Sequence, residues 1–180
     1  TLFRSFMISK NFSHLEYFPP EMDHISEYYL PKVMDPNLLR ADDFFRERYG
    51  ATVINDYAFD WGSGYRDSGL RVPESYDRSW AGDRSFNSDM SAHKYGRASD
   101  KKVSGENHEE IFWDIIENAS MFIEMGIKRI EAMELTIKDR SMPWIHWDTG
   151  YGNEPGLLVI TMDDIYTIDE YKKARKSNSL

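Results

Sequence analysis

The stretch Ser91-Ala-His93-Lys-Tyr-Gly96-Arg-Ala98-Ser-Asp100 carries a histidine and a carboxylate seven residues apart. On a continuous strand, an odd separation sends two side chains to opposite faces of the sheet. On a helix they would share a face but lie about 10.5 Å apart along the axis, too far to hold one ion together. A turn must therefore separate them, and Gly96 stands where that turn is needed. After the turn, Ala98 and Asp100 are predicted to alternate along a strand that presents the carboxylate.

A second candidate histidine lies downstream in Trp144-Ile-His146-Trp-Asp148-Thr-Gly150. On a strand, His146 and Asp148 share one face, whereas Ile145 and Trp147 point into the opposite layer. This alternation predicts a core position for Trp147. The chain contains no cysteine, so a metal ion would have to be held by His, Asp and Glu side chains. Two histidines, one carboxylate and a water form a standard catalytic zinc arrangement, which acidifies the water and polarises a carbonyl.

Length and composition indicate one domain over residues 1–180, with a core at about 10–165 and a C-terminal tail at about 166–180. The apolar content of 41% and the five tryptophans are typical of a globular chain. The net charge is −9 and no basic run precedes Lys172, so we expect no nucleic-acid partner. No apolar stretch approaches the roughly 20 residues that span a bilayer. The chain has no visible signal peptide but also no initiator Met, so the compartment stays open. The sequence leaves the oligomeric state open as well.

Helix and strand signals alternate irregularly along the chain. Asp35 followed by Pro36 is a good helix start, and Gly50 ends that helix. A second helix is predicted at about 107–125, and Thr167 caps a short last one. We therefore expect an α+β fold, with a small antiparallel sheet, helices against one side and the metal cleft on the other. The predicted strands are residues 51–59, 127–135, 144–149 and 157–162, and residues 60–92 form a long loop.

The pattern S-x-H-x-x-G-x-A-x-D at residues 91–100, followed by W-x-H-x-D at 144–148, resembles the zinc D-Ala-D-Ala peptidase and hedgehog-type superfamily. The similarity is greatest to cell-wall peptidases and phage-encoded members. It implies a hedgehog/DD-peptidase-like fold, a phage or bacterial origin, and zinc-dependent hydrolysis of a peptide amide in peptidoglycan. The enzyme would be a D,D- or L,D-type carboxypeptidase or endopeptidase. Weaker matches are residues 11–18 (NFSHLEYF), 52–55 (TVIN) and 68–71 (SGLR), so the resemblance covers roughly residues 10–150.

Carried across position by position, the resemblance makes His93, Asp100 and His146 the ligands of a zinc ion. It also makes Ser91 and Asp148 the side chains that orient these ligands. Hydrogen-bonded neighbours of zinc-bound histidines commonly have this role.

The resemblance further implies an arginine in the long loop that grips a carboxylate or carbonyl of the substrate. Two arginines fit, Arg66 in Ser63-Gly64-Tyr65-Arg66 and Arg71 in Ser68-Gly69-Leu70-Arg71. Arg71 is favoured, because Trp61-Gly62 upstream resembles a W-x-x-G-G stretch of phage relatives. A fixed guanidinium stabilises an oxyanion or binds a carboxylate bidentately. The predicted substrate-binding residues are Arg71, Ser91 and Trp61.

The sequence departs from the family pattern at the general base. Many members place a Glu or His three to five residues before the last ligand, where this chain has Ser141, Met142 and Pro143. These residues cannot accept a proton, and without a base catalysis loses about 10²–10⁴-fold. This departure motivates one alternative, a non-catalytic structural or binding protein such as a virion component. A third interpretation is a metal-dependent peptidase that acts on proteins or free dipeptides rather than on the cell wall. The remaining candidates for the base are Glu131, Glu134, Asp139 and Asp148.

The other histidines and acidic pairs have simpler interpretations. His108 is expected to be solvated in the first turn of a helix, and His14 and His24 to be surface or packing residues. Asp163 and Asp164 are expected in a turn. The pairs Asp42/Asp43 and Glu109/Glu110 are expected on exposed helix faces.

Overall fold

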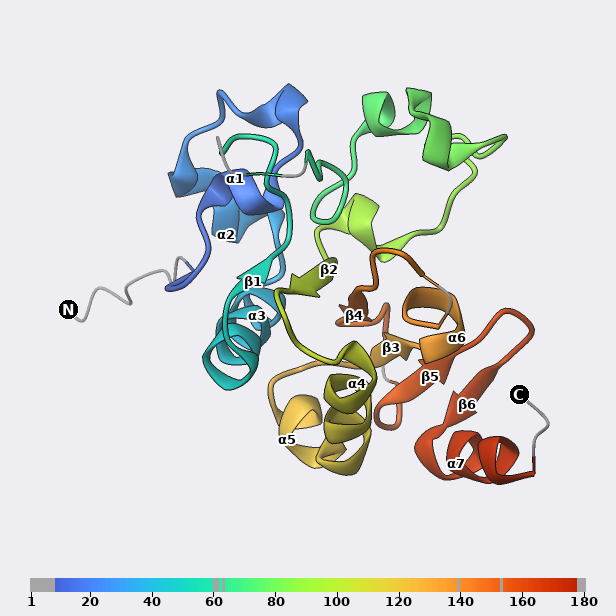
Figure 1. Cartoon of the computed structure of the whole chain (residues 1–180). Helices are drawn as coiled ribbons and strands as arrows, with labels where there is room; N and C mark the ends of the chain where they lie inside the picture. The colour runs from blue at the N-terminus through green and yellow to red at the C-terminus, as the bar shows by residue number, and fades with distance from the viewer. Residues whose placement is uncertain (1–8, 60–61, 63, 139, 153, 178–180) are drawn as a thin grey trace.

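The computed structural model describes residues 9–59, 62, 64–138, 140–152 and 154–177, and within them the central element is a six-stranded sheet (Figure 1). Its order is β1-β2-β4-β3-β5-β6. Neighbouring strands are antiparallel except β3 and β5, which run parallel. This mixed fold with a mostly antiparallel sheet confirms the α+β class. The strands are β1 Thr52–Val53, β2 Ala98–Val103, β3 Arg129–Glu131, β4 Ile145–Asp148, β5 Leu158–Ile160 and β6 Ile165–Thr167.

Helices and short 3₁₀ turns flank this sheet. In Figure 1, α4, α5 and α7 lie below it, and the green segment that contains η3, η4 and η5 lies above it. The α-helices are α1 His14–Tyr17, α2 Leu30–Val33, α3 Pro36–Tyr49, α4 His108–Glu117, α5 Ala119–Glu124, α6 Met133–Thr136 and α7 Ile168–Lys176. The 3₁₀ turns are η1 Pro20–Met22, η2 Glu27–Tyr29, η3 Pro73–Asp77, η4 Ser79–Ala81 and η5 Ala92–Tyr95.

The capped helices form as the sequence predicts. At the start of α3, the Asp35 carboxylate accepts a hydrogen bond from the backbone N–H of Asn37 (2.8 Å). Gly50 ends α3 with φ +88°, a conformation that side-chain-bearing residues rarely adopt. Thr167 caps α7 through a reciprocal exchange of hydrogen bonds with Glu170.

Other elements are shorter than predicted, and their ends have local causes. The helix predicted at 107–125 is broken at Asn118, whose side chain bonds to the carbonyl of Asp114 (2.9 Å). The strand predicted at 51–59 keeps only Thr52–Val53, because the buried side chains that follow bond to the loop instead. The Asn55 side chain accepts from the backbone of Ser68 (2.9 Å).

The C-terminal segment differs from the expected tail at 166–180. Residues 165–176 form β6 and α7, and β6 pairs with β5. Tyr171 on α7 is fully buried and its ring contacts Phe112 of α4. The segment therefore packs into the same core as the rest of the sheet. Asp163 and Asp164 lie in the connection between β5 and β6, as expected.

One face of the sheet packs into the core. Trp147 of β4 is fully buried, as predicted, with Phe45 of α3 (5.1 Å between ring centroids) and Phe122 of α5 (5.6 Å) around it. On β2 the same face carries Ser99 and Lys101. Because helices cover this face, the opposite face of β2 and β4 is left for the cleft, which agrees with the predicted layout.

The core also holds an ion pair that the sequence did not suggest. The Lys101 ammonium lies 3.4 Å from the Asp42 carboxylate, and both side chains are fully buried. Ser99 and Trp147 each donate a hydrogen bond to the same Asp42 oxygen (2.8 Å). The expectation of an exposed Asp42 is therefore wrong, because α3 turns this residue toward β2. Among the described residues, no helix is long and apolar enough to cross a membrane.

Candidate metal centre

Three segments bring the predicted ligands together. His93 lies on η5, Asp100 on β2 and His146 on β4, and the strand register pairs Asp100 directly with His146. The turn expected between the first two ligands is present at Gly96, whose φ is +63°. A side chain at Gly96 would also collide with the backbone of Val33, since its Cβ would lie 2.1 Å from that carbonyl oxygen. Only glycine fits this position.

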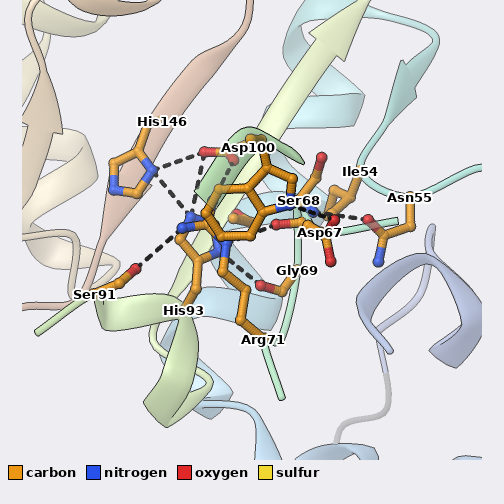
Figure 2. Close-up of polar contacts among 12 residues, drawn as sticks. Ile54, Asn55, Asp67, Ser68, Gly69, Arg71, Ser91, His93, Asp100 and His146 are labelled. Carbon is orange, nitrogen blue, oxygen red and sulfur yellow. Dashed lines mark hydrogen bonds and ion pairs between the residues drawn. The ribbon is translucent and has the colours of Figure 1, made fainter. Parts of the chain in front are cut away.

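The three side chains converge on one point (Figure 2). His93 Nε2 lies 3.3 Å from His146 Nδ1 and 3.4 Å from Asp100 Oδ1, and the last two atoms are 2.7 Å apart. Around a tetrahedral zinc ion with bonds of about 2.0–2.1 Å, ligand atoms are about 3.3–3.4 Å from one another. The two distances from His93 match this value. The 2.7 Å between His146 Nδ1 and Asp100 Oδ1 would have to lengthen slightly for an ion to bind. The buried cluster can hold a metal ion.

Each histidine is oriented by a partner on its other ring nitrogen. His93 Nδ1 lies 2.6 Å from the carbonyl oxygen of Gly69, which turns Nε2 toward the cluster. His146 Nε2 lies 3.7 Å from Asp148 Oδ2, which leaves Nδ1 for the cluster. Asp148 is itself fixed by Arg129 Nε (2.7 Å) and by the backbone N–H of Gly150 (2.7 Å). Such outer partners set the ring orientation and basicity of metal-bound histidines.

The electrostatics of the cluster suit a cation. Burial lowers the pKa of His93 to about 4, with the nearby Arg71 adding to the effect. Burial opposes a low pKa for Asp100, yet His93 and His146 hold that pKa well below its usual range. Burial also opposes protonation of His146, but Glu131 and Asp100 raise its pKa to about 10. A metal ion bound here would displace any proton from the histidine nitrogens that face it, because metal ligands must be deprotonated.

Arg71 lies at the edge of the cluster, whereas Arg66 is exposed at the mouth of the cleft. One terminal nitrogen of Arg71 is 3.4 Å from Asp100 Oδ2, and the other is 3.4 Å from Ser91 Oγ. The Arg71 guanidinium also stacks on the ring of Trp80 (4.6 Å). Ser91 thus contacts Arg71. The two histidines are oriented instead by Gly69 and Asp148. No sequence signal pointed to the Gly69 carbonyl.

The cluster opens into a cleft of about 1070 Å³. Its walls come from the long loop, from β2, β3 and β4, and from the segment before β4. Trp80 and Trp144 both line it, and both carry an arginine against the ring. Trp61, which the sequence placed with the substrate-binding residues, lies outside the described residues.

The register of β3 against β4 places one candidate for the general base, Glu131, on the cleft face. Arg129 of β3 pairs with Asp148 and Ile130 with Trp147, so Glu131 comes next, beside His146. Ile130 is buried, and Glu131 alternates to the cleft face that Arg129 shares with Asp148. Glu131 is therefore a carboxylate of the cleft, and within the described part of the chain no hydrogen bond or ion pair holds it in another position.

The other candidates are placed differently. Glu134 lies outside the cleft lining and accepts hydrogen bonds from Tyr171 (2.9 Å) and Arg175 of α7. Asp148 is held by Arg129 and faces the outer nitrogen of His146. Asp139 lies outside the described residues.

The remaining histidines lie away from the cluster. His24 is exposed, and His14 is half-buried with its ring against Phe18. The expectation of a solvated His108 is wrong: the ring is buried, and Nε2 accepts a hydrogen bond from the backbone N–H of Val103 (3.2 Å). Burial accordingly lowers the pKa of His108.

Comparison of the chain with protein-family models, with curated proteins and with solved structures gave no match.

Proposed function

We propose that this protein is a zinc-dependent peptidase that hydrolyses a peptide amide bond in peptidoglycan, as a D,D- or L,D-type carboxypeptidase or endopeptidase. The observation that carries the proposal is the buried cluster of His93, Asp100 and His146, whose ligand atoms lie 2.7, 3.3 and 3.4 Å from one another at the edge of a cleft. The motif spacing around these residues resembles that of cell-wall peptidases and supports the choice of substrate. A zinc ion at this cluster would acidify water and polarise the substrate carbonyl.

Glu131 is the proposed general base. Its carboxylate faces the cleft beside His146 and takes the place of the base that family members carry before the last ligand. It would accept a proton from the attacking water and deliver it to the nitrogen of the departing amine. A positioned acid–base group of this kind contributes about 10²–10⁴-fold to the rate.

Arg71 is the proposed anchor for the substrate. Its Nε is fixed by the carbonyl oxygen of Asp67 (3.0 Å) and its plane by the Trp80 ring. Among the described residues, its terminal nitrogens make two polar contacts, and both are long: 3.4 Å to Asp100 and 3.4 Å to Ser91. They are therefore available to a substrate carboxylate or carbonyl, which a guanidinium binds bidentately. Arg66 is farther out, at the mouth of the cleft.

The test compares Glu131→Gln with Glu134→Gln, a matched change at the carboxylate that α7 holds outside the cleft. Purified zinc-loaded proteins are incubated with peptidoglycan fragments, and released peptides are identified by mass spectrometry. Glu131→Gln should keep its zinc and lose at least about 10²-fold in turnover. Glu134→Gln should retain activity.

Three other results would change the proposed function or the proposed role of Glu131. Zinc binding without turnover of any wall fragment would favour the non-catalytic structural protein. Release of product from free dipeptides, with intact sacculi untouched, would favour a dipeptidase. Full activity in Glu131→Gln would remove Glu131 from the mechanism.

A further inference from the structure

Lys102 brings a second cation to the floor of the cleft. It follows Asp100 by two residues on β2, so both side chains are on the same face of the strand. The Lys102 ammonium donates to the carbonyl oxygen of Ile54 (3.3 Å) and to Ser68 Oγ, and it lies 4.3 Å from the centre of the Tyr65 ring. Figure 2 shows Ile54 and Ser68 on the far side of Asp100 from His146.

The hydrogen-bond partners of Lys102 are neutral, unlike those of Arg129 and Arg78 in the same cleft wall, and Asp100 and Asp56 act on its charge only from farther away. Among the described residues, no carboxylate oxygen lies within 4.0 Å of its ammonium. Arg129, in contrast, is paired with Asp148, and Arg78 is paired with Asp67. A partly buried ammonium whose hydrogen-bond partners are all neutral regains little of the hydration free energy that it lost on burial. An anion bound beside it would compensate for more of that loss.

The net charge around the metal cluster also favours an anionic ligand. The chain as a whole carries a net charge of −9, yet its cleft floor is cationic once a divalent ion is bound. The ion, Arg71 and Lys102 then outweigh the carboxylates of Asp100 and Glu131, while the Arg129–Asp148 pair is neutral in itself. A ligand with more than one negative group would restore the balance.

We propose that Lys102, together with Ser68 and Tyr65, forms an anion subsite beside the metal cluster, and that the substrate is an acidic peptide. This inference rests on the proposed function and narrows its substrate class. Arg71 takes one carboxylate of the peptide, and Lys102 takes a second one on a neighbouring residue. Asp100 and Lys102 are two positions apart on β2, about 6.6 Å along the strand, which equals about two residues of an extended peptide. The second carboxylate therefore lies within two residues of the cleaved amide.

The test uses pairs of synthetic peptides that differ only by Glu or Gln at the residue next to the cleaved amide. Binding to zinc-loaded Glu131→Gln protein is measured by calorimetry, so that turnover does not interfere. The Glu131→Gln protein, which keeps Lys102, should bind the Glu peptide about tenfold more tightly than the Gln peptide, as one charge-assisted contact provides. Adding Lys102→Met should abolish this preference, adding Lys102→Arg should retain it, and adding the exposed control Lys173→Met should leave it unchanged.

Zinc content and thermal unfolding of the Lys102→Met protein establish that fold and cluster are intact. If the Glu and Gln peptides bind equally to the native-Lys102 background, or if the preference survives in a folded Lys102→Met protein, the subsite is overturned and the peptidase proposal stands. If neither peptide binds to zinc-loaded protein, both the subsite and the peptidase proposal are overturned.

Discussion

Asp100 and His146 face each other across the antiparallel strands β2 and β4, with His146 Nδ1 2.7 Å from Asp100 Oδ1. Two of the three candidate ligands are therefore positioned by the hydrogen-bonded ladder of the sheet itself. His93 is the ligand that depends on a loop, and Gly96 sets the turn that brings it back to the sheet. The site should thus respond to changes in that turn and in the partners of its histidines.

Replacing Gly96 by Ala should damage both stability and metal binding. Its φ of +63° costs a residue with a side chain about 1–2 kcal/mol, and the added Cβ would meet the Val33 carbonyl oxygen at 2.1 Å. Gly105→Ala is the matched control, because φ there is +76° and nothing lies within 4 Å of the added atom. Urea unfolding and zinc titration should show the larger loss at Gly96. Equal losses at both positions would mean that the close approach to Val33 is unimportant.

Asp148→Asn should weaken zinc binding by about 10–100-fold without removing a ligand. The carboxylate faces His146 Nε2 at 3.7 Å, and its charge is balanced by Arg129. Competition with a zinc chelator measures the affinity, and the exposed Asp163→Asn serves as the control. An unchanged affinity in Asp148→Asn would show that this carboxylate does not support His146.

Lys101→Met should destabilise the fold by about 3–5 kcal/mol, because it leaves the Asp42 carboxylate buried without its cation. Adding Asp42→Asn to the same chain should recover most of the loss, since both charges are then absent and the amide oxygen still accepts from Ser99 and Trp147. Urea unfolding of the single and double variants measures both effects. Zinc content should not change in either folded protein, because Lys101 points to the core face of β2. A double variant as unstable as the single one would contradict this view of the pair.

Stability should fall as the pH rises from about 4.5 to about 7 through the effect of Glu16. Burial raises the pKa of Glu16 to about 7, although Ser13 and Arg46 act against it. In this window the folded protein keeps a proton that the unfolded chain has released, so higher pH favours unfolding. Glu16→Gln retains an acceptor for the backbone N–H of Ser13 and should raise stability at pH 8 by about 1–3 kcal/mol.

Urea unfolding at pH 5 and pH 8 tests this effect, with the exposed Glu74→Gln as the control. The difference between the two pH values should shrink in Glu16→Gln and persist in Glu74→Gln. An undiminished difference in Glu16→Gln would assign the pH dependence to other groups.

Local signals in the sequence were sufficient for some features of this structure. The α3 boundaries follow from Asp35, Pro36 and Gly50, because caps act within one turn of the helix. The opposite faces of His146 and Trp147 follow from strand alternation alone. These features need no knowledge of which strands are neighbours.

Features that depend on distant partners could not be predicted in this way. The burial of Asp42 requires Lys101 on another element, and the role of His108 requires the backbone of Val103. The position of Glu131 beside His146 follows from the pairing of β3 with β4, which periodicity along one segment cannot supply. The carbonyl of Gly69 carries no sequence signature, because every residue has one.

The decisive measurement is the metal content of the purified chain, determined by mass spectrometry beside His93→Ala and Asp100→Ala. We predict about one zinc per native chain, as a three-residue site with one open position requires, and loss of zinc in both variants. His24→Ala, at an exposed histidine away from the cluster, should retain the metal. A native chain that stays free of zinc when zinc is supplied, or variants that bind as much zinc as the native chain, would contradict a zinc site at His93, Asp100 and His146.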